Sequence, residues 1–196
     1  MTSVDFPSIV NRGIQKLGLS YEVKRKAKSD GDCMYDSTFA VAFEDPLMRA
    51  DLSHRTLGVN CVKSLRIELA KFMKKDLQLQ ELPEFQRCRD FTLNDDYNKG
   101  QISWDQYLER MATTKEYADQ LTVLCMALFC GKDILHVSDS TRRGDNPWVL
   151  TAGTLEGWPY PVKGPPIRLA YLHQSEHYEP LQMKQQPEWS PCTLLG

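Results

Sequence analysis

The chain has 196 residues, and at about 150 residues per domain this length allows one domain with short ends. Its 24 Lys and Arg residues nearly balance its 26 Asp and Glu residues, for a net charge of -2, and 41% of its residues are hydrophobic. This composition indicates a folded globular protein and excludes a disordered chain. The balanced charge gives no general attraction to nucleic acid or to an anionic membrane, so we expect neither as a partner.

Six cysteines, at positions 33, 61, 88, 125, 130 and 192, lack the dense spacing of small disulfide-rich secreted proteins. No apolar run has the length of a signal peptide core, nor the roughly 20 residues that span a bilayer. We therefore expect a monomer in the reducing environment of the cytoplasm or nucleus. The chain has no Cys-x-x-Cys pair, and its four histidines do not fall in zinc-finger spacing, so we expect no metal and no cofactor.

The first informative segment is residues 30–43, where the sequence DGDCMY leads into an apolar helical stretch. A tight glycine turn therefore places Cys33 at the start of a helix. The positive end of the helix dipole and the unpaired N–H groups there favour the thiolate form of a cysteine. Together with the N–H groups of the turn, they could also receive the negative oxygen of a tetrahedral intermediate.

Three later segments carry apolar residues at spacings of three and four, which predicts amphipathic helices. They run from Leu57 to Phe72, from Trp104 to Met111 and from Tyr117 to Leu128. We expect the residues of these apolar stripes to form the core. Gly131 follows the third helix at the position where a left-handed C-terminal cap favours glycine.

After Gly131, four short segments predict strands: Ile134 to Val137, Trp148 to Thr151, Ile167 to Leu172 and His177 to Leu181. The last two are separated by a connection of hairpin length. Helices followed by closely connected strands predict an α/β class fold of α+β character, with a small, mostly antiparallel central sheet packed between helices.

His177 stands out among the histidines because it begins the last predicted strand, where backbone pairing holds it in place. Glu179 lies two residues further on, so both side chains project from the same face of the strand. A carboxylate there can accept the ring N–H of the histidine and fix its tautomer. Cys33, His177 and an orienting acid would complete the set of groups that a cysteine hydrolase needs.

These segments resemble the ovarian tumour (OTU) family of cysteine proteases. Residues 30–35 are similar to the family signature D-G-N-C-[LM]-[FY], and the stretches 169–171 and 177–179 are similar to its closing strand and His-Tyr-x motif. The apolar helix and strand over residues 117–137 also follow the family pattern. The resemblance covers roughly residues 20 to 182 in register and implies a papain-like OTU fold. Residues 1–19 would then form an N-terminal helical extension and residues 183–196 a tail.

The resemblance implies that Cys33 is the nucleophile, that His177 is the general base and acid, and that Glu179 orients His177. The family counterpart of Asp30 lies in the loop before the nucleophile and helps to shape the oxyanion hole. Whether Asp30 or Glu179 orients the histidine therefore stays open.

On the same resemblance, Gly31, Asp32 and the Cys33 amide would form the oxyanion hole. The chain departs from the family pattern at Asp32, where Asn is usual, at Asp36, where Arg or another polar residue is frequent, and at positions 117–118, which carry Tyr-Ala in place of Trp-Gly. An acidic side chain beside the nucleophile disfavours the thiolate by like-charge repulsion unless it points to solvent.

The family implies a deubiquitinase that cleaves the bond at the C-terminal glycine of ubiquitin, polyubiquitin or ubiquitin-like conjugates. Two alternatives remain: a non-catalytic ubiquitin-binding module with the OTU fold, and a cysteine peptidase of another papain-like family. The ubiquitin tail carries arginines before its terminal glycines, so its channel should offer carboxylates. Candidates are Glu44, Asp45, Asp95, Asp96 and Asp145.

Overall fold

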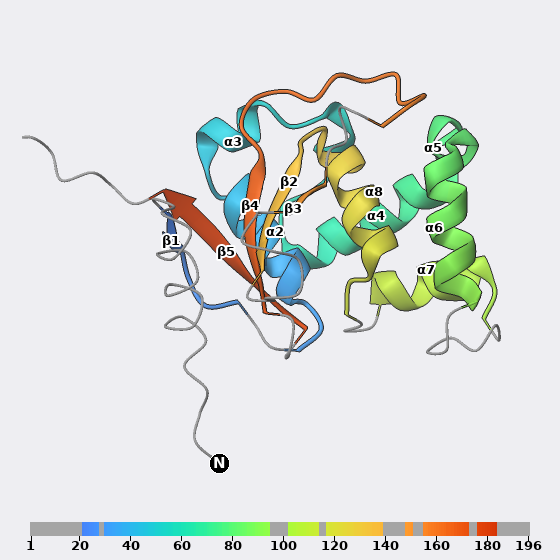
Figure 1. Ribbon diagram of the computed structural model, residues 1–196, viewed down its shortest axis with the longest axis horizontal. Coiled ribbons are helices and arrows are strands. Elements are labelled where there is room, and N and C mark those ends of the chain that lie inside the picture. The colour runs from blue at the N-terminus through green and yellow to red at the C-terminus, as the bar shows by residue number, and fades with distance from the viewer. Residues whose placement is uncertain are drawn as a thin grey trace, which may run out of the picture.

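The computed structural model of the protein describes residues 21–27, 30–94, 102–113, 117–138, 148–150, 155–172 and 176–183. The expected N-terminal extension, residues 1–19, lies outside these residues. The expected tail, residues 183–196, also lies outside them except for Met183, which belongs to the last strand. Within the described part, helices and strands form a single α/β arrangement with the sheet at one side and most helices at the other (Figure 1).

The sheet has five strands in the order β1-β5-β4-β2-β3. Their bounds are β1 (Tyr21–Val23), β2 (Ile134–Ser138), β3 (Trp148–Leu150), β4 (Ile167–Leu172) and β5 (His177–Met183). Strand β2 pairs in parallel with β4, whereas the β1–β5, β4–β5 and β2–β3 pairings are antiparallel. The predicted strands and the mostly antiparallel sheet are therefore confirmed, and β1 is an edge strand that the sequence pattern did not predict.

The described helices precede the central strands along the chain. They are α2 (Cys33–Ala42), α3 (Pro46–Ala50), α4 (Val62–Lys75), α5 (Leu77–Glu81), α6 (Pro83–Asn94), α7 (Trp104–Thr113) and α8 (Gln120–Cys130), with a short 3-10 turn, η1 (His54–Thr56), before α4. Helix α2 packs against β4 and β5, whereas α5, α6 and α7 lie at the end of the molecule away from β1 (Figure 1). None of the described helices combines the length and hydropathy needed to cross a membrane.

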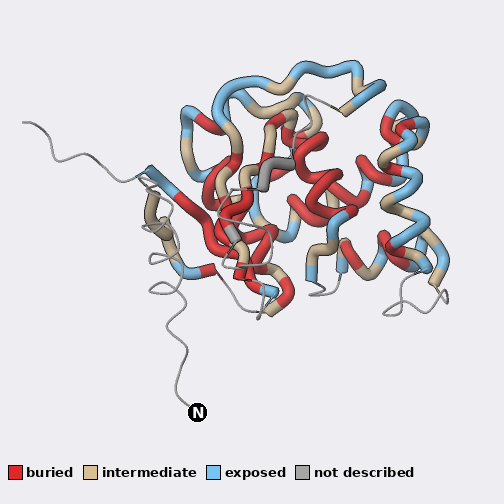
Figure 2. The backbone as a smooth tube through the Cα atoms, viewed as in Figure 1, coloured by how far each residue is buried: buried red, intermediate tan, exposed pale blue. Residues whose placement is uncertain are grey.

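Helix α8 forms the centre of the core, because every residue from Leu121 to Cys130 is buried (Figure 2). It begins where the Asp119 side chain accepts a hydrogen bond from the Thr122 amide at 2.7 Å, as an N-cap residue does. It ends at Gly131, whose φ of 66° confirms the predicted left-handed cap. The five cysteines of the described residues are all free thiols.

Two predicted helices begin later than their apolar patterns suggested. Leu57 and Tyr117 were expected in buried stripes, but they are 87% and 54% exposed, so those two assignments are wrong. The capping residues explain the difference, because Cys61 caps the helix that starts at Val62 and Asp119 caps α8. A helix start is set by the residue that satisfies its free N–H groups, and hydrophobic periodicity does not detect that residue.

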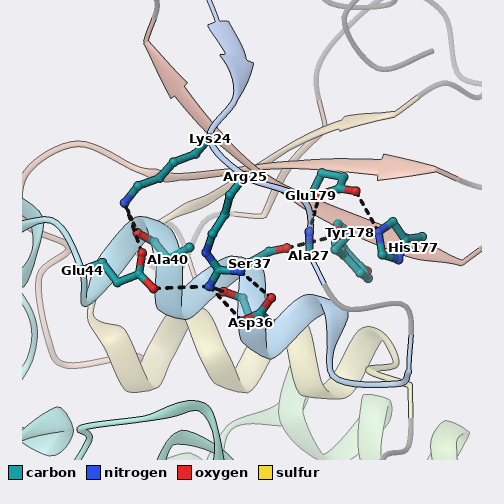
Figure 3. Close-up of polar contacts among 10 residues, drawn as sticks. All are labelled: Lys24, Arg25, Ala27, Asp36, Ser37, Ala40, Glu44, His177, Tyr178 and Glu179. Atoms are coloured by element: carbon teal, nitrogen blue, oxygen red, sulfur yellow. Dashed lines mark hydrogen bonds and ion pairs between the residues drawn. The ribbon is translucent and has the colours of Figure 1, made fainter. Parts of the chain in front are cut away.

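The two faces of the sheet carry different apolar clusters. Leu169 and Tyr178 belong to the main core beneath the helices, whereas Ala170 and Leu172 belong to a small second cluster. In the β4–β5 register, Leu172 pairs with His177 and Ala170 pairs with Glu179. Because side chains alternate along a strand, His177 and Glu179 point away from the face that Tyr178 occupies (Figure 3).

Candidate active site

Cys33 is the first residue of α2 and is only 1% exposed. The turn before it needs glycine, because Gly31 has a φ of 80°, which side-chain-bearing residues rarely adopt. The sequence thus places the thiol where expected, at a helix N-terminus directly after a tight turn. Helix α2 packs along β5, and this contact brings the N-terminus of α2 to the start of that strand.

The N-terminus of α2 is not capped by a side chain. Asp32 occupies the N-cap position, but its side chain makes no capping hydrogen bond. Its Oδ1 instead accepts a hydrogen bond from Arg66 at 2.6 Å. The first N–H groups of the helix, starting with that of Cys33, are therefore not satisfied by Asp32 and suit an oxyanion that forms beside the thiol.

His177 and Glu179 contact each other directly, with 3.0 Å between Nε2 and Oε1 (Figure 3). Both are buried, His177 at 3% exposed and Glu179 at 0%. The second carboxylate oxygen of Glu179, Oε2, accepts a hydrogen bond from the Ala27 amide at 2.7 Å. With Oε1 on the imidazole and Oε2 on the backbone, the carboxylate group is held in one orientation.

The imidazole of His177 interacts with Cys33 as well as with Glu179. Burial lowers the pKa of His177, but hydrogen bonds and charge interactions with Cys33 and Glu179 outweigh it and raise the pKa from 6.5 to about 9. For His136, burial lowers the pKa to about 4, which shows the opposite balance. His177 is therefore an imidazolium at neutral pH. Since Glu179 engages Nε2, Nδ1 is the ring nitrogen left for the thiol.

The backbone before His177 also contacts the thiol. The Cys33 thiol donates to the carbonyl oxygen of Glu176 at 3.8 Å. Glu176 has a φ of 49°, and it is the one residue other than glycine with a positive φ among those described. This turn directs the chain into β5 so that the side chain of its first residue, His177, reaches Cys33.

Two acidic residues near the nucleophile, Asp32 and Asp36, each have an arginine partner. Arg66 pairs with Asp32 and also donates from Nε to the Met111 carbonyl at 2.8 Å, while Arg25 pairs with Asp36 at 2.6 Å. The two guanidinium groups therefore offset the like-charge repulsion that Asp32 and Asp36 would exert on a thiolate at Cys33. Sequence spacing could not identify the arginines, because Arg66 lies 34 positions from Asp32.

The remaining acidic candidates lie in different places. Asp30 is half-buried in the loop before Gly31. Glu44 pairs with Lys24 at 3.7 Å and lies beyond the C-terminal end of α2. Because α2 rises about 1.5 Å per residue, its far end is already about 13 Å from Cys33. Asp45 caps α3 by accepting from the Leu47 amide at 2.9 Å. The candidates at positions 95, 96 and 145 lie outside the described residues.

Among the described residues, no three His, Cys, Asp or Glu side chains gather closely enough to hold a metal ion. The chemistry that the described site supports is nucleophilic: a thiol at a helix N-terminus, an imidazolium in contact with it and a carboxylate that fixes the imidazolium.

Comparison with known proteins agrees with this geometry. The sequence model of a family described as OTU-like cysteine protease matches residues 28–178. The solved OTU domain of OTUD1 superposes with a TM-score of 0.56 at 13% identity, over 89% of this chain and 93% of that one. An OTU deubiquitinase from Wolbachia pipientis wMel, solved bound to ubiquitin, superposes with a TM-score of 0.51 at 16% identity, over 86% of this chain and 99% of that one. No curated protein sequence matches the chain significantly. The structural likenesses confirm the expected fold.

Proposed function

Because the chain belongs to the OTU-like cysteine protease family, we propose that it is a deubiquitinase that hydrolyses the bond at the C-terminal glycine of ubiquitin or a ubiquitin-like modifier. The observation that carries the proposal is the imidazole of His177, which interacts with Cys33 on one side and with Glu179 on the other. The ubiquitin bound to the Wolbachia relative supports the choice of substrate.

In the proposed reaction, the Cys33 thiolate attacks the carbonyl carbon of the terminal glycine. The N–H groups at the start of α2 receive the oxyanion of the tetrahedral intermediate. His177 then gives its proton to the departing lysine amine, which leaves a thioester on Cys33. Water then hydrolyses the thioester, with His177 now acting as the base, and Cys33 is released for a further cycle.

The proposal is tested with ubiquitin that carries an electrophile in place of its C-terminal carboxylate. We expect the full chain to form a one-to-one covalent adduct, which peptide mass spectrometry locates at Cys33. A binding module without an activated thiol would bind the probe but form no adduct. A peptidase of another papain-like family would react with a small alkylating agent at Cys33 and ignore the ubiquitin probe. Either result would contradict the proposed function.

The pH dependence of hydrolysis should show an alkaline limit near the pKa of His177. This pKa is raised to about 9, so the imidazolium is fully present at neutral pH and is lost as the pH rises through about 9. We expect kcat for a ubiquitin-amide substrate to fall on that alkaline limb. In Glu179→Gln, one interaction that raises the pKa is weakened, and the limb should move to lower pH. A limb that stays in place in this variant would contradict the proposed contact between the two side chains.

Glu179→Ala should lower kcat by roughly a hundredfold, because it frees the imidazole to rotate away from Cys33. Asp30→Ala should lower kcat by a smaller factor, if the role of Asp30 is limited to shaping the loop before Gly31. The two variants are compared by steady-state kinetics at a pH where the wild type is fully active. If the order is reversed, Asp30 or another acid orients His177 and the assignment of Glu179 is wrong.

A further inference from the structure

The segment between β1 and α2 lies across the catalytic carboxylate. We call residues 24–27 the strap. At one end, the Lys24 amide continues the β1–β5 pairing by donating to the Pro180 carbonyl at 2.8 Å. At the other end, the Ala27 amide donates to Oε2 of Glu179 at 2.7 Å. The strap thus covers the last strand at the point where the carboxylate must be held, and Glu179 is fully buried.

Two side chains of the strap attach it to α2 (Figure 3). Arg25 donates to both carboxylate oxygens of Asp36, from Nη1 to Oδ2 at 2.6 Å and from Nη2 to Oδ1 at 2.8 Å. Lys24 donates from Nζ to the Ala40 carbonyl at 2.5 Å. The paired geometry matters because a planar guanidinium that makes two parallel hydrogen bonds fixes direction as well as distance.

The Arg25–Asp36 pair differs from an ordinary surface ion pair. The Asp36 side chain is only 6% exposed and that of Arg25 is 35% exposed, so the guanidinium reaches a carboxylate that is almost removed from solvent. Asp36 belongs to the same helix as Cys33, less than one turn further on. One ion pair therefore connects the helix that carries the nucleophile to the segment that holds Glu179.

We propose that Arg25 and Asp36 are positioning residues for the reaction: their ion pair holds the strap on α2, and the strap, through the Ala27 amide, holds the Glu179 carboxylate toward His177. This inference rests on the proposed function. It also gives a role to the acidic residue at position 36, where the family pattern has Arg or another polar residue. In this proposal the ion pair acts through the orientation of Glu179 and takes no part in the bond changes of the reaction.

The test compares Arg25→Gln and Asp36→Asn with the wild type on a ubiquitin-amide substrate. Asp36→Asn keeps the side-chain size, Arg25→Gln shortens the side chain, and each change removes one charge. We expect kcat to fall by about tenfold with KM unchanged, because a small displacement of an orienting group lowers the rate of the chemical step and leaves binding intact. Arg25→Lys, which keeps the charge and loses the paired geometry, should recover part of the loss. Gln182→Ala is the matched control. It removes a 2.9 Å hydrogen bond between Gln182 of β5 and Glu22 of β1, does not alter the strap, and should leave kcat unchanged.

A double-mutant cycle shows whether the ion pair acts through Glu179. In a Glu179→Ala background, Arg25→Gln should have no further effect on kcat. If Arg25→Gln lowers kcat by the same factor in both backgrounds, or leaves the wild-type kcat unchanged, the inference is overturned. The melting temperature of each variant shows whether it is folded. Because Arg25 is half-exposed, its substitution should leave the core intact.

A measurement without ubiquitin separates this inference from the proposed function. The NMR titration of the His177 ring, assigned with His177→Gln, should give a lower pKa in Arg25→Gln than in the wild type. Cys33 from α2 and Glu179 from β5 both raise the pKa of this ring, and of these two contacts only the one with Glu179 should change. If the wild type does not cleave ubiquitin, the proposed function fails while this titration still decides the role of the strap. An unchanged pKa of His177 in Arg25→Gln would contradict the proposed role of the strap.

Discussion

Cys33→Ala is expected to abolish hydrolysis of ubiquitin-amide and diubiquitin substrates, with a loss in kcat of roughly 10⁵-fold or more. The change removes the thiol that begins α2 and interacts with His177, so the reaction has no nucleophile from which the thioester could form. Because the substitution removes a single heavy atom from a buried position, we expect the melting temperature to stay within a few degrees of the wild type. The assay is steady-state cleavage of a panel of diubiquitin linkages.

The control for this variant is Cys61→Ser, which alters an exposed thiol at the N-cap of α4 and retains a residue able to cap. It should leave the cleavage rate unchanged. If Cys33→Ala kept measurable cleavage while its circular dichroism spectrum matched the wild type, another group would have to be the nucleophile, and the assignment of the site would be wrong.

His177→Ala is expected to have the second largest effect, a loss in kcat of roughly 10⁴-fold. Without the imidazolium, the thiolate lacks its charge partner and the departing amine lacks its proton donor, so both halves of the reaction slow down. Affinity for ubiquitin should change little, because the side chain is buried behind the thiol and belongs to the chemical step. Single-turnover kinetics at saturating enzyme measure the chemical step separately from the binding of ubiquitin.

His54→Ala is the matched control, since His54 is an exposed residue of the turn η1 and should not influence cleavage. His177→Ala should also lose the alkaline limb near pH 9 that the wild type shows. If the limb persisted in the variant, it would belong to a different group, and His177 would not be the proton donor.

The sequence contained enough to predict the central elements of the fold. The helical patterns around Leu65 and Leu124 and the four strands after Gly131 all correspond to described elements. These elements are detectable because their buried residues are close together in the chain, so periodicity records the burial directly. The same holds for His177 and Glu179, whose contact follows from alternation along one strand.

Other elements left no local pattern to detect. Strand β1 has only three residues, and all of them are half-buried, so no alternation distinguishes it from a loop. Helix α6 buries just Phe85 and Thr92 among its twelve residues. The pairing of Arg25 with Asp36 and of Arg66 with Asp32 depends on tertiary packing. The sequence position of a charged residue does not indicate which oppositely charged residue it will contact. The sequence predicts which groups react, and the structure adds the side chains and backbone groups that hold them in place.

The position of β5 in the sheet has a consequence for the order in which activity appears during synthesis. This strand lies between β1 and β4, and its Glu179 bonds an amide 152 positions earlier in the chain. A nascent chain therefore carries the thiol early but lacks the imidazole until the last strand has left the ribosome and entered the gap between its neighbours. Contacts that span so much of the chain form slowly, because a long loop must close before they can contribute. We therefore expect incomplete chains to be inactive, and insertion of the final strand to complete the sheet and the catalytic site in one event.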